Sequence, residues 1–459
     1  MNYEPNILTL TDSYKASHYK QYPPGSTRVF SFFESRGGRY KEVLFFGLQY
    51  FIKKYLAGVV VTEEKIEEAK GVFALHFGSS ENFNEAGWRH ILEKHGGRLP
   101  LLIKAVKEGT RVPVSNVLMT VVNTDSAVPW LTNYVETLLV QVWYPTTVAT
   151  QSYFMKQTIL RYLEETGTPE LISFKLHDFG FRGSTSVESA GLGGAAHLVN
   201  FKGTDTVEAL LVARRYYREQ MAGFSIPAAE HSTITSWGKD REVDAYRNML
   251  EQYPKGPVAV VSDSFNVFRA CAELWGKELK DKILERDGLL VIRPDSGEPT
   301  EVVPKILEIL GAAFGFETNS KGYKVLNPKV RLIQGDGIDW QSIGGILEAM
   351  KKAGWSADNI AFGSGGGLLQ KLDRDTQKFA FKCSSIERDG AWYDVMKDPV
   401  TDSGKRSKAG RLALIKDVTG YRTMGTDEAG KRNLLETVFC DGELIVEYSF
   451  DVIRKQALL

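Results

Sequence analysis

The segment LLVIRPDSG, residues 289–297, decides the fold class. A continuous apolar run ends in a turn that carries Arg293 and Asp295, and a helical pattern follows. A short apolar run without polar alternation is typical of a strand in a parallel sheet, because helices cover both faces of such a sheet. The segment therefore predicts one strand–turn–helix unit of an α/β fold.

The same pattern recurs on both sides of this segment. The other runs are LISFKLHDFGFR (171–182), HLVNFKGTDT (197–206), GFSIPAAEHS (223–232), GPVAVVSDS (256–264), VRLIQGDG (330–337) and NIAFGSGGG (359–367). Apolar spacing near 3.6 residues predicts helices within 267–286 and 340–355. About seven such units in ~200 residues favour a closed β/α barrel over an open sheet.

The two flanks of this region have a different pattern. Residues 1–165 mix helical segments with strand-like runs such as TRVFSFFES, and residues 373–459 alternate strand signals with polar turns. We therefore expect a barrel over residues 166–372 that carries the active site. We expect the two chain ends to form one flanking α+β domain, whose C-terminal part supplies basic residues for phosphate.

Composition excludes several functional classes. The 57 basic and 57 acidic residues give a formal net charge of +0, which argues against non-specific nucleic-acid binding. Cys271, Cys383 and Cys440 form no CxxC pair, so neither a zinc site nor a disulfide framework is expected. No secretory leader pattern and no apolar run of ~18 residues is found, so the expected location is the cytoplasm.

Polar or glycine residues, accompanied after the first run by Phe179, follow every one of the seven runs. In parallel β/α folds ligands bind at the carboxyl ends of the strands, so these residues are expected to meet on one rim. They are Asp178, Phe179, Arg182, Asp205, Glu230, His231, Asp263, Arg293, Asp295, Asp336 and Gly363 to Gly367.

Two glycine segments on this rim indicate phosphate. QGDG (334–337) and GSGGG (363–367) each follow an apolar run, and glycines let backbone N–H groups approach an anion closely. Either segment alone is more often a tight turn before a helix. Together, with Asp336 as an acceptor for sugar hydroxyls, they favour a ribose phosphate.

A basic set lies in the C-terminal part of the chain. Taken alone it indicates a solvated loop, but pyrophosphate requires cations that the glycine segments do not supply. The set comprises Arg374, Lys382, Lys397, Lys405, Arg406, Lys408 and Arg411.

These motifs carry a resemblance over nearly the whole chain, from Asn6 to the end. TDSYKASHY, KLHDFGFRG, VNFKGTDT, SIPAAEHSTITSWGKD, VVSDS, IRPDSG, IQGDG, FGSGGGLLQK and KDPV…GKRSKAGR occur in the order found in nicotinamide phosphoribosyltransferases, so the sequence resembles that family. The resemblance implies an irregular β/α barrel of the type II phosphoribosyltransferases and a homodimer with active sites at the subunit interface. It also implies formation of nicotinamide mononucleotide and pyrophosphate for NAD salvage, with Mg²⁺ and coupling to ATP hydrolysis.

The resemblance assigns residues to the nicotinamide pocket. Phe179 and the partner subunit's Tyr14 would stack on the two faces of the pyridine ring. Asp205 would accept a hydrogen bond from the amide and repel the carboxylate of nicotinate. Without the resemblance Asp205 would be interpreted as a helix N-cap. Arg182, Ser225, Ile226 and Arg293 would complete the pocket.

The resemblance also assigns the reacting and phosphate-binding groups. His231 would be phosphorylated by ATP and oriented by Glu230 or Asp263, with Asp295 beside the ribose; a lone histidine at a strand end is otherwise more often structural. Mg²⁺ would be held through phosphates. Gly335, Asp336, Gly365 and Gly366 would bind the ribose and its phosphate, and Arg36, Arg374, Lys382, Lys397, Lys405 and Arg411 would bind pyrophosphate or ATP.

Three alternatives stay open at the level of sequence. The nearest is a nicotinate phosphoribosyltransferase with the same fold, against which Asp205 argues. A barrel lyase or aldolase would need a Schiff-base lysine at a strand end, where only Lys175 and Lys202 are candidates. A non-catalytic partner-binding protein is disfavoured by the acids and glycines that follow every run.

Overall fold

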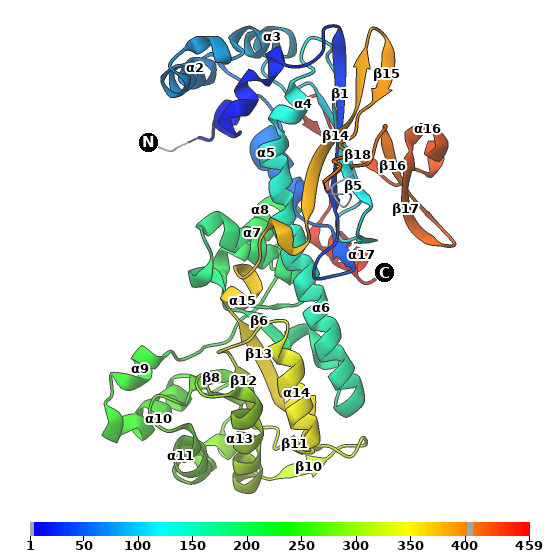
Figure 1. Ribbon diagram of the computed structural model, residues 1–459. Coiled ribbons are helices and arrows are strands. Elements are labelled where there is room, and N and C mark those ends of the chain that lie inside the picture. Colours follow the sequence, from blue (N-terminus) through cyan, green and yellow to red (C-terminus); the bar gives the residue numbers. More distant parts are fainter. Residues whose placement is uncertain (1–3, 402–406) are drawn as a thin grey trace. The chain divides into compact units, whose positions relative to one another are not determined.

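The computed structural model describes residues 4–401 and 407–459, and the chain divides into two compact units (Figure 1). Unit 1 holds the described residues of 1–150, 215–219 and 372–459, and unit 2 holds residues 151–214 and 220–371. Helices α6 (Trp143–Thr166) and α8 (Val207–Tyr217) contribute residues to both units.

Unit 2 is built on a curled parallel sheet with strand order β7-β6-β13-β12-β9-β8. The segment 224–229 bridges its two edges, because it pairs with β7 through Gly203↔Phe224 and with β8 through Ala228↔Ala259, both in parallel. All seven predicted runs therefore lie in this curled sheet. The strands are β6 (Leu176–Asp178), β7 (Gly203–Thr204), β8 (Val258–Val261), β9 (Leu290–Arg293), β12 (Val330–Gln334) and β13 (Ile360–Ser364).

Burial on both faces explains the apolar character of these strands. All four residues of β8 are buried. Ala259, Val291 and Ile333 form one cluster inside the curl, against which Phe179 and Ile226 pack. A parallel sheet covered on both sides leaves its strand ends as the places where polar side chains reach solvent.

Helices follow most of the strands of unit 2. The predicted helix over 340–355 is confirmed as α14 (Ser342–Lys352), but the one over 267–286 is broken into α11 (Val267–Arg269), a π-helical stretch over Ala270–Glu278, and α12 (Lys280–Glu285). The helices are α7 (Val187–Leu198), α9 (His231–Thr235), α10 (Glu242–Gln252), α11 (Val267–Arg269), α12 (Lys280–Glu285), α13 (Pro299–Phe314), α14 (Ser342–Lys352) and α15 (Gly366–Leu369), and a small hairpin pairs β10 (Phe316–Thr318) with β11 (Lys324–Leu326).

Unit 1 is built on a seven-stranded antiparallel sheet with strand order β15-β14-β1-β5-β3-β18-β19. Strand β1 of this sheet pairs with β5 on one side and with β14 on the other, so the two chain ends share one sheet. The strands are β1 (Ser26–Ser35), β3 (Leu101–Ala105), β5 (Val117–Asn123), β14 (Phe379–Arg388), β15 (Ala391–Asp394), β18 (Glu436–Cys440) and β19 (Glu443–Leu444).

Helices and two small two-stranded sheets complete unit 1. The helices are α1 (Leu48–Phe51), α2 (Glu63–Phe77), α3 (Glu85–His95), α4 (Leu131–Tyr134), α5 (Glu136–Leu139), α16 (Thr426–Ala429) and α17 (Phe450–Ala457); the small sheets pair β2 (Glu42–Leu44) with β4 (Arg111–Pro113) and β16 (Leu412–Asp417) with β17 (Gly420–Gly425). Across residues 4–401 and 407–459, no helix is both long and apolar enough to span a membrane.

Candidate active site

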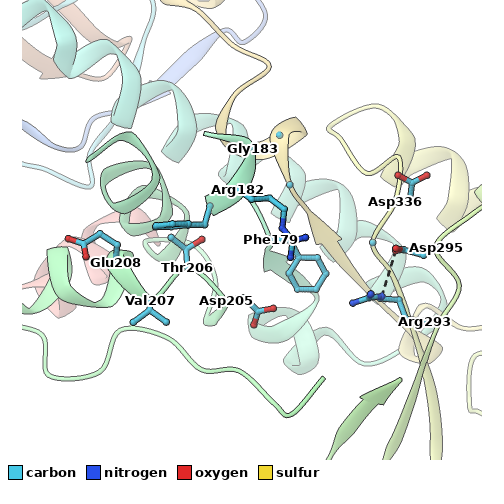
Figure 2. A pocket seen from close by; sticks show the side chains of 14 residues that line it. Phe179, Arg182, Gly183, Asp205, Thr206, Val207, Glu208, Arg293, Asp295 and Asp336 are labelled. Carbon is cyan, nitrogen blue, oxygen red and sulfur yellow. Dashed lines mark ion pairs between the residues drawn. The ribbon is translucent and has the colours of Figure 1, made fainter. Parts of the chain in front are cut away.

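A cavity of about 720 Å³ opens at the carboxyl ends of the strands of unit 2 (Figure 2). Residues after β6, β7, β9, β12 and β13 line it, as expected for a ligand site in a parallel β/α fold. The lining residues are Phe179, Phe181, Arg182, Gly183, Asp205, Thr206, Val207, Glu208, Arg293, Asp295, Gly335, Asp336, Gly365 and Gly366.

Phe179 presents an aromatic ring to this cavity. It follows β6 directly, and its backbone N–H donates to the Ser364 carbonyl of β13 at 2.9 Å. The ring packs over Gly363, where an added Cβ would lie 1.9 Å from the Phe179 ring. Glycine is therefore required at position 363 for the ring to take this place, which leaves a flat apolar face beside the polar groups of the rim.

Asp205 lies after β7 and is held by two hydrogen bonds. Its Oδ1 accepts from the Ser225 hydroxyl, and His177 Nε2 lies 3.3 Å from the same oxygen. Burial opposes ionisation, but the bonds from His177 and Ser225 outweigh burial and hold the pKa of Asp205 below its ordinary value. An ionised carboxylate only accepts hydrogen bonds, so the cavity offers a fixed acceptor beside the Phe179 ring.

His177 contacts the site although the sequence gives no sign of it. Its ring lies 5.4 Å from that of Phe179, centroid to centroid. A Cβ at Gly203 would lie 2.4 Å from His177 Nδ1, so glycine in β7 makes room for the imidazole. By contrast, His197 is fully buried, bonds to Ser152 at 2.9 Å and does not line the cavity.

Arg293 and Asp295 lie side by side at the end of β9, with Arg293 Nε 3.6 Å from Asp295 Oδ1 (Figure 2). Arg293 Nε is buried and has no hydrogen-bond partner among the described residues. Burial raises the pKa of Asp295; Arg293 opposes this, whereas the carboxylates of Asp263 and Asp336 add to it. Several carboxylates therefore lie at this rim beside the Arg293 guanidinium, whose Nε has a donor to spare for a ligand.

His231 is the first residue of α9 and lies between two of these acids. Its Nε2 is 2.9 Å from Asp263 Oδ1, and its Nδ1 is 4.0 Å from Asp295 Oδ2. The Asp263 side chain is 5% exposed and that of His231 46%, so a buried acid orients a solvent-accessible imidazole. Of the two expected orienting acids, Asp263 makes the contact, whereas the carboxylate of Glu230 accepts from the Ser232 hydroxyl.

The glycines of the rim allow close backbone approach. A Cβ at Gly335 would lie 3.1 Å from Asp295 Oδ1, which is tighter than ordinary packing. Gly365 and Gly366 line the cavity with backbone alone, and Asp336 is exposed at its mouth. The Ile226 side chain packs against the barrel interior beside Phe179 rather than lining the cavity.

Four of the predicted phosphate-binding cations lie together in unit 1. Burial lowers the pKa of Lys382; Glu136 opposes this shift, and Arg36, Arg374 and Lys397 add to it. Arg36 Nε also lies 3.1 Å from Glu34 Oε1, while its Nη2 is buried without a hydrogen-bond partner in the described part of the chain. A cluster of four cations that includes a buried donor without a partner favours binding of an anion.

The remaining predicted residues of unit 1 have other surroundings. Arg411 is paired with Asp427 at 2.7 Å and lies 5.2 Å from the centre of the Trp392 ring. Lys405 and Arg406 lie outside the described residues. Tyr14 is 57% exposed on a 3₁₀ helix over Ser13–Lys20, with its ring 4.9 Å from His18.

Several lining residues were not predicted from sequence. Phe181, Gly183, Thr206, Val207 and Glu208 border the cavity because the turn after β6 and the first turn of α8 reach over the strand ends. Their positions depend on where these turns pack. Only their closeness in the chain to the predicted Arg182 and Asp205 could have indicated them.

Solved structures with low sequence identity share this fold. The nicotinate-nucleotide pyrophosphorylase of Pyrococcus furiosus matches with a TM-score of 0.59 at 16% identity, over 100% of this chain and 96% of that one. The human nicotinic acid phosphoribosyltransferase matches with a TM-score of 0.57 at 14% identity, over 98% and 93%. The predicted fold class is confirmed: the barrel and its accompanying sheet unit are those of the type II phosphoribosyltransferases.

Sequence relatives narrow this class. The family model described as Nicotinate phosphoribosyltransferase (NAPRTase) matches residues 174–443, and the Nicotinamide phosphoribosyltransferase N-terminal domain matches residues 6–103. The nicotinamide phosphoribosyltransferase of Xanthomonas campestris pv. campestris is 54% identical over 100% of this chain and 99% of its own length. That of Acinetobacter baylyi is 34% identical over 99% and 98%. The chain belongs to the nicotinamide phosphoribosyltransferase family of pentosyltransferases.

Proposed function

We propose that this protein transfers the phosphoribosyl group of phosphoribosyl pyrophosphate to nicotinamide, giving nicotinamide mononucleotide and pyrophosphate. The observation that carries the proposal is the Asp205 carboxylate, which His177 and Ser225 hold ionised in a cavity that also presents the Phe179 ring. Membership of the family supports the same chemistry.

Recognition of nicotinamide follows from these groups. The pyridine ring stacks on Phe179, and its amide NH₂ donates to Asp205, while Arg182 borders the same cavity. Nicotinate would bring a second carboxylate against Asp205, which is unfavourable in a partly desolvated site. The site therefore discriminates by attraction to the amide and by repulsion of the acid.

The phosphoribosyl group fits the rim beyond the ring. Asp336 is an acceptor for ribose hydroxyls, and the bare backbone of Gly335, Gly365 and Gly366 allows phosphate oxygens to approach N–H groups. The cluster of Arg36, Arg374, Lys382 and Lys397 has the charge that pyrophosphate or an ATP tail needs. We assign these cations, together with Tyr14, to the active site of the partner subunit in a homodimer.

Bond breaking requires alignment more than proton transfer. The ribose C1–O bond to pyrophosphate breaks as the pyridine nitrogen attacks C1, and this nitrogen carries no proton, so no general base is needed. Cations that stabilise the departing pyrophosphate and a ring held in line with C1 supply the catalysis. Asp295, beside the ribose, favours positive charge as it develops on the sugar.

The acids of the rim fit Mg²⁺. Burial raises the pKa of Asp295, and the nearby carboxylates of Asp263 and Asp336 add to that rise. Carboxylate oxygens together with substrate phosphates are the ligands that Mg²⁺ takes. When bound, Mg²⁺ neutralises developing charge on pyrophosphate. Asp263 and Asp295 are the residues that would hold it beside the phosphates.

His231 is the group we assign to ATP coupling. A carboxylate can only accept, so Asp263 selects the tautomer whose Nε2–H donates to it, and the lone pair of Nδ1 is left as nucleophile. Attack of Nδ1 on the γ-phosphorus of ATP forms the N–P bond and releases ADP. The phosphorylated imidazole would add negative charge beside Asp263 and Asp295, the residues that would hold Mg²⁺. We place the whole reaction in NAD salvage in the cytoplasm.

A pyrophosphate-release assay with each pyridine, with and without ATP, tests the proposal. We expect release with nicotinamide, weak release with nicotinate, and faster turnover with ATP. Equal or better use of nicotinate would favour the alternative, a nicotinate phosphoribosyltransferase. The family model that matches residues 174–443 is named for that activity.

The ATP step has its own variant. His231→Ala should abolish the nicotinamide-dependent formation of ADP and leave basal pyrophosphate release in place, because the imidazole is the acceptor and not part of the pyridine pocket. His197→Ala is unsuitable as a control because His197 is buried, so exposed His76→Ala serves instead. Normal ATP hydrolysis by His231→Ala would rule out the phosphohistidine.

A further inference from the structure

Two of the seven histidines of the chain meet one carboxylate in unit 1. His90 Nε2 lies 2.6 Å from Asp125 Oδ2, and His95 Nε2 lies 2.7 Å from the same oxygen. The three potential ligand atoms all lie within 4.8 Å of one another. None of these residues lines the cavity or belongs to the proposed reaction.

The backbone holds the three side chains together. His90 and His95 lie on α3, which ends at His95 because Gly96 takes a left-handed conformation with φ of 58°. Asp125 follows β5 in a turn, where its carbonyl accepts from Asn123 Nδ2 at 2.7 Å and its Oδ1 accepts from the Ala127 N–H at 2.9 Å. These bonds direct Oδ2 towards the two imidazoles, as outer hydrogen bonds orient carboxylates in metal sites.

The ligand set indicates a particular class of ion. Two imidazole nitrogens and one carboxylate oxygen suit Zn²⁺, Co²⁺, Ni²⁺ or Cu²⁺, whereas Mg²⁺ and Ca²⁺ prefer oxygen alone. The Nδ1 atoms of His90 and His95 make no hydrogen bond within the described residues, so nothing there fixes either ring against a metal-binding orientation. The side chains are 31%, 28% and 20% exposed, which leaves room for water at a fourth position.

We propose that His90, His95 and Asp125 form a binding site for a divalent transition-metal ion of the Zn²⁺ class. The ion replaces the two shared hydrogen bonds at Asp125 Oδ2 and cross-links the end of α3 to the turn after β5. Because the cross-linked residues are far apart in the chain, the ion stabilises the folded state of unit 1. The rival interpretation is two imidazole N–H groups that donate to one carboxylate without metal.

Cobalt titration of the whole protein separates the two interpretations. Bound metal is first removed with a chelator, and Co²⁺ alone is then added to the His231→Gln variant. This substitution removes the imidazole beside Asp263 and Asp295, so that a nitrogen-ligated cobalt spectrum cannot arise there. We expect one equivalent of Co²⁺ to give the visible absorption of a low-coordinate, nitrogen-ligated ion, which Zn²⁺ then displaces.

Variants locate the ion. His90→Gln with His95→Gln, and separately Asp125→Asn, should weaken Co²⁺ binding by about tenfold or more and remove the rise in Tm that Zn²⁺ gives. His76→Gln, an exposed histidine on α2, should bind as before. Basal pyrophosphate release should be unchanged in every one of these variants.

A crystal soaked in Zn²⁺ gives a readout that does not depend on how the variants fold. We expect an anomalous peak between the two Nε2 atoms and Asp125 Oδ2. Absence of the peak, absence of the cobalt spectrum, or undiminished binding in the double variant would each overturn the metal site in favour of the hydrogen-bonded cluster.

Discussion

At the scale of a single residue, we propose that selectivity between two nearly identical pyridines depends on the charge of Asp205. His177 and Ser225 bond to this carboxylate and stabilise its ionised form, so the group stays an acceptor across the neutral range. An amide and an acid differ at the position that this acceptor faces. A residue interpreted from the sequence alone as a helix cap therefore becomes the specificity determinant of the proposed reaction.

The Asp205→Asn substitution tests that role. Asparagine keeps the shape and one acceptor but removes the charge, so nicotinamide loses part of a charge-assisted bond while nicotinate escapes repulsion. We expect the ratio of kcat/KM for nicotinamide over nicotinate to fall by roughly 10²-fold, about 2.7 kcal/mol.

A matched control separates this local effect from a general change in charge. Glu208→Gln removes a carboxylate from the wall of the same cavity. It should leave the ratio within about threefold of the unmodified protein, since a difference of that size is under 1 kcal/mol. An equal fall in both variants would mean that overall charge, and not Asp205, sets selectivity.

At the scale of elements, β13 limits where the Phe179 ring can lie. A methyl group at Gly363 would lie 1.9 Å from that ring, so Gly363→Ala must shift the ring from this position without removing it, unlike the loss of the whole ring in Phe179→Ala. We expect the KM for nicotinamide to rise about fivefold, equivalent to about 1 kcal/mol of lost stacking, with little change in the KM for phosphoribosyl pyrophosphate.

Gly344→Ala is the matched control for this substitution. Gly344 lies in α14, where the nearest atom to an added Cβ is 3.7 Å away, so the change should preserve KM and slightly stabilise the helix. Unchanged nicotinamide kinetics in Gly363→Ala would show that the ring is not a stacking face.

The buried carboxyl of Glu108, which accepts a hydrogen bond at the start of α1, makes the stability of unit 1 depend on pH. Burial raises the pKa of Glu108 to about 7, while its bond from the Gln49 N–H at 2.6 Å opposes that rise. The folded protein therefore keeps a proton on Glu108 at pH values where the unfolded chain, with a pKa near 4.5, has lost it. Raising the pH from 5 to 8 should lower the free energy of unfolding through this group by on the order of 2–3 kcal/mol.

Urea titrations at the two pH values measure this contribution. Glu108→Gln has no proton to lose, so its free energy of unfolding should change less between pH 5 and pH 8 than that of the unmodified protein. Glu428→Gln, at an exposed position of α16, should change as the unmodified protein does. If Glu108→Gln kept the full difference, the carboxyl would be ionised at both pH values.

At the scale of the whole molecule, the sequence predicted the barrel better than its rim. The seven apolar runs and the parallel sheet come from local patterns that repeat along the chain, and the structure has both. The π-helical stretch over Ala270–Glu278 and the contact of His177 with Asp205 depend on packing between segments far apart in the chain. Roles for Tyr14 or Arg36 came only from the family resemblance, since neither residue has a local signature.

The division of the predicted site between two sets of residues leads to a test of assembly. Phe179 and Asp205 belong to unit 2, whereas Tyr14 and the cations around Lys382 belong to unit 1, and we propose that each complete site takes the second set from the partner subunit. Tyr14→Ala and Phe179→Ala should each be nearly inactive alone. After the two are mixed and allowed to exchange subunits, half of the dimers are mixed, and one site in each has both aromatic residues intact.

Activity in the mixture should therefore recover to roughly a quarter of that of the unmodified protein, as expected for a symmetric dimer with shared sites. Mixing two batches of Phe179→Ala provides the control, because no pairing of these subunits restores the ring. A mixture whose rate equals the sum of its parts, under conditions where subunit exchange is shown by mass, would place both aromatic residues of each site on one chain and remove the need for a dimer.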